Sequence, residues 1–206
     1  MLRLATFLLA ASTFGNGAAV NDFNAHVDEA VGRHQPPVIR DKRSLHLEAH
    51  IPFHSFTVAS NGLFNRDLQV KLTDGAVSGL DDVTRRLRSC VRPTCQVDLR
   101  GLVVSYIAQT RGDDLAGTRK NIWVEVTVTS AEALFNMSDI RASVTSLNSL
   151  IIGPISTRTS YDTYLNLNSR RRKEFVQEVA RYSRWELRKI LRGSYLSALQ
   201  ETFAYH

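Results

Sequence analysis

Residues 169–203, SRRRKEFVQEVARYSRWELRKILRGSYLSALQETF, carry the longest helical pattern in the chain. Gly193 is the one weak interior position for a helix in this stretch. Placed at about 100° per residue, the apolar side chains fall on two stripes rather than one. The first stripe holds Val176, Val179, Ala180, Leu187, Ile190 and Leu191, and the second holds Tyr182, Trp185, Leu196, Leu199 and Phe203. Because apolar side chains cover more than half of its circumference, this helix must be wrapped by other elements or leave an apolar face for a ligand.

The same stretch concentrates positive charge. Nine basic residues stand against three acidic ones between Arg170 and Arg192, and this surplus equals the formal net charge of +6 of the whole 206-residue chain. Arg181, Arg184 and Arg188 are therefore the predicted contacts with an anionic membrane surface, where each basic residue contributes about 1 kcal/mol. The alternative is a solvated helix face with acid–base pairs one turn apart.

Upstream of this helix, apolar and polar residues alternate with the two-residue period of β-strands. The stretch 45–54 has one apolar face, and further extended runs are predicted over 56–72, 96–109, 122–129 and 135–147. In the run 96–109 the alternation places Val97, Leu99, Gly101, Val103, Ser105 and Ile107 on one face. Asp74-Gly75 predicts a turn, and residues 110–117 predict a polar hairpin connection.

A short amphipathic helix is predicted over residues 20–33, where Phe23, Val27, Ala30 and Val31 share one face. The next residues, 34–43, contain Pro36-Pro37 and a charge cluster, which predict an exposed linker that ends this helix. The order of elements predicts an α+β fold in a single domain over residues 20–206. In this fold a curled antiparallel β-sheet is wrapped around a long C-terminal α-helix, with a short N-terminal helix.

The first residues have the pattern of a secretory signal peptide, which we place at residues 1–19. Arg3 supplies the positive start, residues 4–14 are apolar and uncharged, and residues 15–19 are small enough for cleavage. A short membrane anchor fits less well, because polar residues and glycines interrupt the apolar run before it reaches the ~20 residues a spanning helix needs. We expect a secreted, extracellular protein, and therefore no nucleic-acid partner.

Two further features suit an oxidising, extracellular compartment. Cys90 and Cys95 are separated by four residues that include Pro93, so a local disulfide is predicted, with a redox role as the alternative. Asn136-Met137-Ser138 is an acceptor sequence for glycosylation at Asn136, which would place that side chain on the surface.

Two short motifs point to protein partners. Arg40-Asp41-Lys42-Arg43 resembles the recognition sequence of proprotein convertases, with cleavage before Ser44, and its alternative is a solvated charge run. Arg111-Gly112-Asp113 is the tripeptide that integrin-type receptors recognise, and its alternative is a plain polar turn.

The sequence contains none of the common catalytic signatures. It has no nucleophile elbow, Gly-rich phosphate loop, H-E-x-x-H or C-x-x-C motif, so we expect no enzyme activity and no cofactor. His46, His50 and His54 share the parity of Glu48 on an extended segment. Strand positions four apart are roughly 13 Å apart, too far for one ion, so no metal site is predicted.

One segment resembles a known family. Residues 68–86, LQVKLTDGAVSGLDDVTRR, are similar to the corresponding strand and turn of arthropod relatives of the dust-mite group 7 allergens. The order of parts is similar too. That family resembles one half of the tubular lipid-binding proteins, the superfamily of bactericidal/permeability-increasing protein and juvenile-hormone-binding protein.

The resemblance implies a secreted, non-catalytic carrier or binder of lipid, or of another small hydrophobic ligand, in a groove between the sheet and the C-terminal helix. The two apolar stripes of residues 176–203 fit this role independently, and the second supplies the predicted ligand-binding residues Tyr182, Trp185, Leu196, Leu199 and Phe203. The alternative is a secreted interaction protein without a ligand, acting through the Arg-Gly-Asp hairpin or the basic helix. The sequence leaves the ligand and the oligomeric state open.

Overall fold

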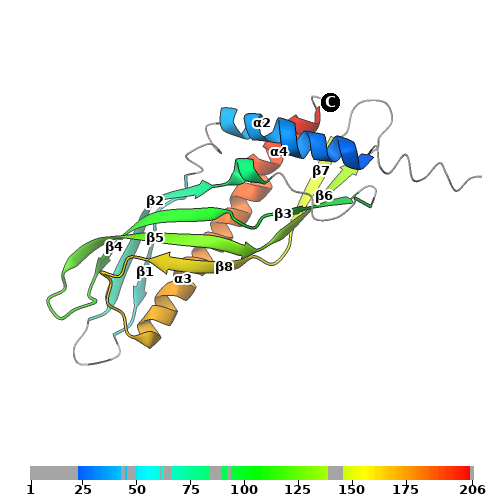
Figure 1. Cartoon of the computed structure of the whole chain (residues 1–206). Helices are drawn as coiled ribbons and strands as arrows, with labels where there is room; N and C mark the ends of the chain where they lie inside the picture. Colours follow the sequence, from blue (N-terminus) through cyan, green and yellow to red (C-terminus); the bar gives the residue numbers. More distant parts are fainter. Residues whose placement is uncertain are drawn as a thin grey trace, which may run out of the picture.

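A long C-terminal helix runs along the inside of a curled antiparallel sheet (Figure 1). The computed structural model describes residues 23–42, 45, 50–60, 62, 66–83, 90–91, 94–138 and 146–204. The helix is continuous through α3 (Ser169–Ile190), the π-helical turn η3 (Leu191–Tyr195) and α4 (Leu196–Ala204). The side chain of Asn168 caps its start by accepting a hydrogen bond from the Arg171 amide at 3.1 Å. The helix predicted over residues 169–203 is confirmed, and Gly193 lies in its π-helical turn.

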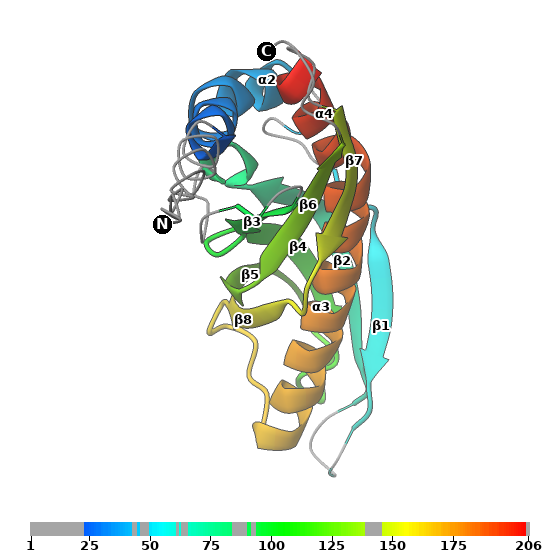
Figure 2. The same ribbon diagram turned by 90° about the vertical axis from the view of Figure 1, so that its right-hand side faces the viewer.

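Five strands form the larger sheet. They are β1 (His54–Val58), β2 (Leu68–Ser78), β4 (Val103–Arg111), β5 (Arg119–Ser130) and β8 (Ser156–Tyr161), in the order β1-β2-β4-β5-β8. All neighbouring strands are antiparallel. The sheet curls around α3, which contacts both edge strands, β1 and β8, and also β5 (Figure 2).

A smaller three-stranded sheet surrounds the other end of the helix. It consists of β3 (Thr94–Asp98), β6 (Glu132–Ser138) and β7 (Ser146–Ile152), in the order β3-β6-β7, and β7 packs on α4. Only Ala131 separates β5 from β6, so the two sheets follow each other along the helix (Figure 1). The α+β architecture predicted from the sequence is confirmed.

The core lies between the inner face of the sheets and the helix. In β5, Ile122, Val124, Val126 and Val128 are buried and the residues between them are more exposed, as their alternation predicts. Helix residues of both apolar stripes are buried against them. Among these are Val179, Leu187, Leu191, Leu199 and Phe203, and Phe175, which belongs to neither predicted stripe, is buried as well.

The predicted linker over residues 34–43 is wrong. Residues 23–29 are helical, and the helix continues through η1 (Ala30–His34) into α2 (Gln35–Asp41). Pro36 and Pro37 are the second and third residues of α2, within its first turn, where their fixed φ suits a helix and where a missing N–H costs little. Buried contacts hold this helix in place: Ile39 is in the core, and the Gln35 amide donates to the Tyr195 hydroxyl at 3.0 Å.

The Asp74-Gly75 pair makes a β-bulge inside β2, so the predicted turn is also wrong. The register of β2 against β4 shifts between Thr73 and Ala76, and Asp74 adopts a positive φ of 51°. A Cβ on Gly75 would lie 2.7 Å from the Cβ of Ile51 and 2.8 Å from the Tyr106 ring. Only glycine fits where these two side chains approach the strand.

Three predicted strands are each divided in the structure. The run 56–72 is divided between β1, which ends at Val58, and β2, which begins at Leu68. The run 96–109 turns at Arg100-Gly101, with a positive φ of 90° at Gly101, and is divided into β3 and β4. The turn reverses the alternation, so Leu102, Val104 and Tyr106 are buried and Ile107 is exposed, contrary to the single face predicted. The run 135–147 is divided into β6 and β7, with 139–145 outside the described residues. The strand expected over 45–54 begins only at His54, and residues 46–49 are likewise not described.

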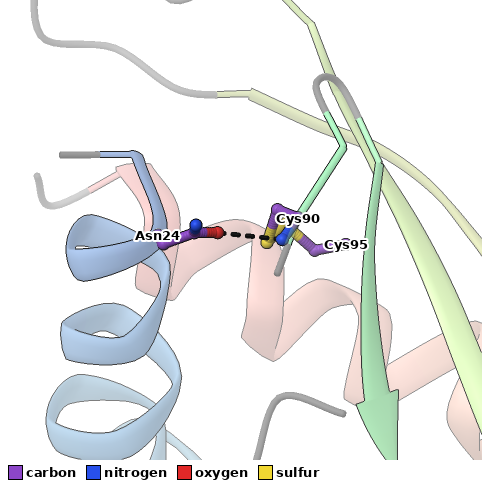
Figure 3. The surroundings of a disulfide bond; sticks show 3 residues. All are labelled: Asn24, Cys90 and Cys95. Carbon is purple, nitrogen blue, oxygen red and sulfur yellow. Dashed lines mark hydrogen bonds between the residues drawn. A yellow bond between two sulfur atoms is a disulfide. The ribbon is translucent and has the colours of Figure 1, made fainter. Parts of the chain in front are cut away.

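Cys90 and Cys95 form a disulfide, as predicted (Figure 3). Both residues are buried, and the Cys90 amide donates to the Asn24 side-chain oxygen at 2.8 Å. The hydrogen bond to Asn24 and the disulfide together connect the N-terminal helix to the start of β3. Asn136, the predicted glycosylation site, has an exposed side chain in the middle of β6. The predicted signal peptide, residues 1–19, lies outside the described residues.

Candidate functional site

The curled sheet leaves one face of α3 uncovered, between the edge strands β1 and β8 (Figure 2). A cavity of about 480 Å³ lies in this opening. Its lining comes from β1 and from successive turns of α3: His54, Arg181, Tyr182, Arg184, Trp185 and Arg188. The helical residues are three or four positions apart, so their side chains share one face of α3.

Aromatic rings form one wall of the cavity. The rings of His54 and Tyr182 stack with centroids 4.1 Å apart, and the Tyr182 hydroxyl donates to the Pro52 carbonyl at 2.7 Å. These contacts join α3 to the β1 edge. Trp185 lies next to Tyr182, with ring centroids 6.2 Å apart, and is 56% exposed. An indole has an apolar body and a polar N–H, so an exposed Trp185 is a candidate contact for a ligand, a partner or a membrane interface.

Basic groups surround the exposed indole. Arg181 makes two hydrogen bonds to Glu178, at 3.2 and 2.5 Å. Arg184 donates to the Thr157 hydroxyl of β8 at 3.2 Å, which joins α3 to the other sheet edge. The Lys189 ammonium lies 4.7 Å from the centroid of the Trp185 ring and 3.3 Å from Glu186, whose side chain is buried. The cavity thus combines an aromatic wall with a cationic rim.

His54 is held in its neutral form. Burial lowers its pKa from the usual 6.5, the positive charge of Arg181 lowers it further, and Glu178 and Glu186 oppose the change. Its Nε2 atom is buried with no hydrogen-bond partner among the described residues, which agrees with the desolvation. Burial, together with Glu186, also raises the pKa of Tyr182 to about 12, so this hydroxyl stays protonated and remains a donor.

The structure separates the five predicted ligand-binding residues into two groups. Tyr182 and Trp185 line the cavity, together with the three predicted surface arginines Arg181, Arg184 and Arg188. Leu199 and Phe203 are fully buried, and the Phe203 ring packs 5.7 Å from that of Phe135. Leu196 is half-buried against the same core. The sequence analysis singled out the basic and aromatic residues of α3 that line this cavity. It did not predict His54 as a lining residue, because the alternation of residues 45–54 placed His54 on the polar face of a strand.

The Arg-Gly-Asp tripeptide occupies the end of β4 and the loop after it. The Asp113 side chain is only 2% exposed and pairs with Lys120. A Cβ on Gly112, whose φ is 106°, would overlap the Asp67 carbonyl at 2.2 Å. This tight, buried geometry does not present the Asp113 carboxylate to a receptor, and the integrin-type alternative gains no support.

The convertase-like motif is held in ordered structure over its first three residues. Arg40 and Asp41 belong to α2, and Arg40 pairs with Asp81 at 2.9 Å. Lys42 pairs with Glu201 at 2.5 Å. Arg43 and Ser44 lie outside the described residues. A protease that reads an extended segment would first have to break these pairs.

The part of the chain that the structure describes contains neither a cluster of metal-binding side chains nor a helix that could span a membrane. There, no group of three or more His, Cys, Asp or Glu side chains is arranged to hold a metal ion. None of the helices in the same part is long and apolar enough to cross a bilayer.

No protein-family model matches the chain. It is 28% identical over 210 residues to the salivary anticoagulant protein P23 of Ixodes scapularis, covering 97% of this chain and 95% of that protein. Among solved structures it is similar to lipopolysaccharide binding protein, with 7% identity and a TM-score of 0.42 over 89% of this chain. The match spans 39% of that longer protein. It is also similar to Takeout 1 of Epiphyas postvittana, with 12% identity and a TM-score of 0.29 over 87% of this chain and 86% of that one.

Proposed function

We propose that this chain is a secreted, non-catalytic lipid-binding protein, with a mature domain over residues 20–206, that engages anionic lipid through the opening between β1 and β8. The observation that carries the proposal is the exposed indole of Trp185 within a rim of three arginines. Arginine matches the geometry of a phosphate group with paired hydrogen bonds. Tryptophan is favoured where an apolar phase meets water.

The position of the cavity supports a binder whose ligand enters at the sheet edges. Its volume of about 480 Å³ lies within the ~300–1,000 Å³ common for small-molecule sites. The His54–Tyr182 stack and the Arg184–Thr157 hydrogen bond flank it on the β1 and β8 sides. The groove predicted between sheet and helix is thus proposed at α3, with Tyr182 and Trp185 as contacts, because Leu199 and Phe203 belong to the packed core.

The two tryptophans allow a direct test, because Trp185 lies on α3 and Trp123 lies on β5. Two variants, Trp123→Phe and Trp185→Phe, each keep one reporter. Vesicles of phosphatidylcholine, with or without phosphatidylserine, are titrated into each variant. With acidic vesicles, Trp185 fluorescence is expected to shift to the blue and to be quenched by brominated acyl chains, whereas Trp123 should not be quenched.

Charge variants supply the matched control. Replacing Arg181, Arg184 and Arg188 with Gln should weaken binding to acidic vesicles by roughly tenfold or more, at about 1 kcal/mol per residue. Replacing Arg66, Lys71 and Arg119 with Gln removes the same charge from the outer face of the sheet and should change vesicle binding little. Equal binding to neutral and acidic vesicles, or quenching of Trp123 alone, would overturn the proposal in favour of an interaction protein without a lipid ligand.

The similarity to the tick anticoagulant favours a second candidate function, inhibition of coagulation in saliva. That protein covers almost the full length of this chain, and its name states its effect. A protein that occupies anionic lipid would inhibit any clotting step that needs the lipid surface. Purified chain should then prolong clotting of plasma at limiting phospholipid, and excess acidic vesicles should relieve the effect. Prolongation that acidic vesicles do not relieve would separate anticoagulation from lipid binding.

A further inference from the structure

A second large cavity lies on the outer face of the sheet, away from α3. Its volume is about 600 Å³, and it crosses β1, β2, β4 and β5. The strand register places two adjacent rows of outward side chains there. One row is Thr57, Gln69, Arg111 and Arg119, and the other is Ser55, Lys71, Gln109 and Asn121. The inward neighbours of these residues, such as Leu72 and Ala108, are buried in the core, so the two rows point to solvent.

Positive charge in these rows is not neutralised by the lining of the cavity. Arg111 and Arg119 are direct cross-strand partners, an arrangement of like charges that destabilises a sheet. Lys71 stands in the adjacent row, and none of the described residues around the cavity is Asp or Glu. Two like-charged arginines side by side are expected where an anion from outside the protein neutralises them.

The carboxylates nearest to these cations in the sequence already have partners. Asp67 accepts a hydrogen bond from the Ser60 amide at 2.8 Å, and Asp113 pairs with Lys120. Asp114 accepts from the amides of Gly117 and Thr118, at 2.6 and 3.0 Å. The bonds to Asp113 and Asp114 shape the β4–β5 loop. Among the described residues that line the two cavities of this face, Asp67 is the one carboxylate against Arg66, Lys71, Arg111 and Arg119, so positive charge predominates.

The basic surface continues beyond the cavity along the same edge. A neighbouring cavity of about 340 Å³ shares Gln69 and Arg111 and adds Arg66 and one carboxylate, Asp67. The position of a Cβ on Gly117 is 3.4 Å from Arg66 Nη1 and 3.5 Å from Arg111 Nε, so the two guanidinium groups converge on one point. Arg111 Nε is also fixed by donating to the Gly117 carbonyl at 3.2 Å. The cations Arg66, Arg111, Arg119 and Lys71 form one continuous basic surface, which we call the outer basic face.

We propose that the outer basic face binds a linear sulfated polysaccharide. Four strands and two rows give a patch of roughly 14 by 7 Å, which fits a polymer lying across the strands better than a single small ion. Gln69, Gln109 and Asn121 add amide donors and acceptors for sugar hydroxyls and sulfates. The side chains of the two rows are all polar, whereas a membrane contact needs apolar side chains that insert.

An aromatic group borders this patch on one side. Trp123 and Ile107 are cross-strand partners in the next outward row, and Trp123 is 44% exposed. Its indole is available to pack against a sugar ring beside the sulfate-binding rows. Trp123 therefore also serves as a spectroscopic reporter of this face, separate from Trp185 on α3.

Affinity for a heparin-derived hexasaccharide tests the proposal, with the chemically desulfated hexasaccharide as its control. The wild-type chain is expected to bind the sulfated form, and the Trp185→Phe variant should report binding through Trp123 fluorescence. Replacing Arg66, Lys71 and Arg119 with Gln should raise the Kd about tenfold, since exposed ion pairs contribute modestly but add up. Replacing Asn121 with Ala, which changes no charge, should weaken binding by a smaller factor if the amides contact the sugar.

The α3 variant separates this site from the lipid site. Gln at Arg181, Arg184 and Arg188 should leave hexasaccharide affinity within about twofold of wild type. If this variant loses affinity as strongly as the outer-face variant, binding is non-specific attraction by net charge and the proposal fails. The proposal is also overturned if the desulfated hexasaccharide binds as tightly as the sulfated one. It fails as well if the outer-face variant loses binding to acidic vesicles but keeps its affinity for the hexasaccharide. Circular dichroism and thermal midpoints close to wild type confirm that each variant is folded.

Discussion

His54 of the edge strand β1 stacks on Tyr182 of α3, with ring centroids 4.1 Å apart and ring planes 11° apart. The imidazole is thus held against the long helix at the mouth of the proposed lipid site. Because burial and Arg181 lower its pKa, the contact is made by the neutral ring. A proton on His54 would place a further positive charge beside the three arginines.

Folding stability should therefore decrease as the pH falls through about 6.5. Above that pH, His54 is neutral in both the folded and the unfolded chain and has no pH-dependent effect. Below it, the unfolded chain takes up a proton that the folded protein resists, so the free energy of unfolding declines until the lowered folded pKa is passed. Urea midpoints between pH 7 and 5 should fall less for His54→Phe, which keeps a stacking ring. Parallel curves for the two proteins would show that His54 does not contribute.

Binding of acidic lipid should become stronger over the same pH range. A phosphate beside Arg181 offsets the repulsion that lowers the pKa of His54, so binding is coupled to uptake of a proton. Vesicle titrations of the wild-type chain at pH 7.5 and 5.5 should show higher affinity at the lower pH. The His54→Phe variant should lose most of this difference, and a difference that persists unchanged must come from other groups.

The Cys90–Cys95 disulfide should be present in all of the purified protein. Both cysteines are buried, so alkylation must be performed in denaturant to be informative. Mass spectrometry should find no label without reductant and two labels after reduction. Replacing both cysteines with Ser should lower the free energy of unfolding by about 2 kcal/mol through loss of a short closed loop. Stoichiometric labelling without reductant would refute the disulfide.

Gly75 and Gly193 should respond oppositely to replacement by alanine. The Gly75→Ala methyl would overlap Ile51 and Tyr106, so a loss of about 1–3 kcal/mol is expected from overpacking. At Gly193 nothing lies within 4 Å of the new methyl, and a helical alanine should raise stability by up to about 1 kcal/mol. Chemical denaturation measures both changes. If the two variants were equally stable, the close contacts of Gly75 with Ile51 and Tyr106 at the bulge would be contradicted.

We expect the mature chain, as proposed for a secreted protein, to begin near residue 20 rather than at Ser44. Residues 23–41 are helical and supply core side chains, including Phe23, Val27 and Ile39. Cleavage after Arg43 would separate this helix from the rest of the chain. N-terminal sequencing of natively secreted material decides the question, and a major species starting at Ser44 would show that a convertase processes the chain despite these contacts.

Periodicity was sufficient to predict the elements that face a single core. The C-terminal helix, the burial pattern of β5 and the Cys90–Cys95 bond all follow from local spacing. Errors arose where tertiary contacts override local preference. The Pro36-Pro37 pair starts α2 because a buried Gln35 and Ile39 hold that helix to the core, and no local signal shows this.

The candidate site was predictable on the helix but not on the sheet. The spacing of Arg181, Arg184, Trp185 and Arg188 on one helical face is visible in the sequence, and these residues line one cavity. His54 joins them only because β1 is the sheet edge that lies beside α3. The outer basic face escaped prediction for a similar reason. Its cations come from three strands and from Arg66, which precedes β2, and only the register brings Arg111 and Arg119 together.

The bulge at Asp74 and Gly75 restricts how this chain can accept insertions and deletions. Residues 68, 70 and 72 of β2 face the core before it, and residues 75 and 77 face the core after it, so one extra residue reverses the alternation. A deletion at this point would turn Val77 toward solvent, or else turn Lys71 into the core and remove it from the outer basic face. In an alignment of homologous sequences, a gap here should therefore be accompanied by a compensating insertion elsewhere in β2.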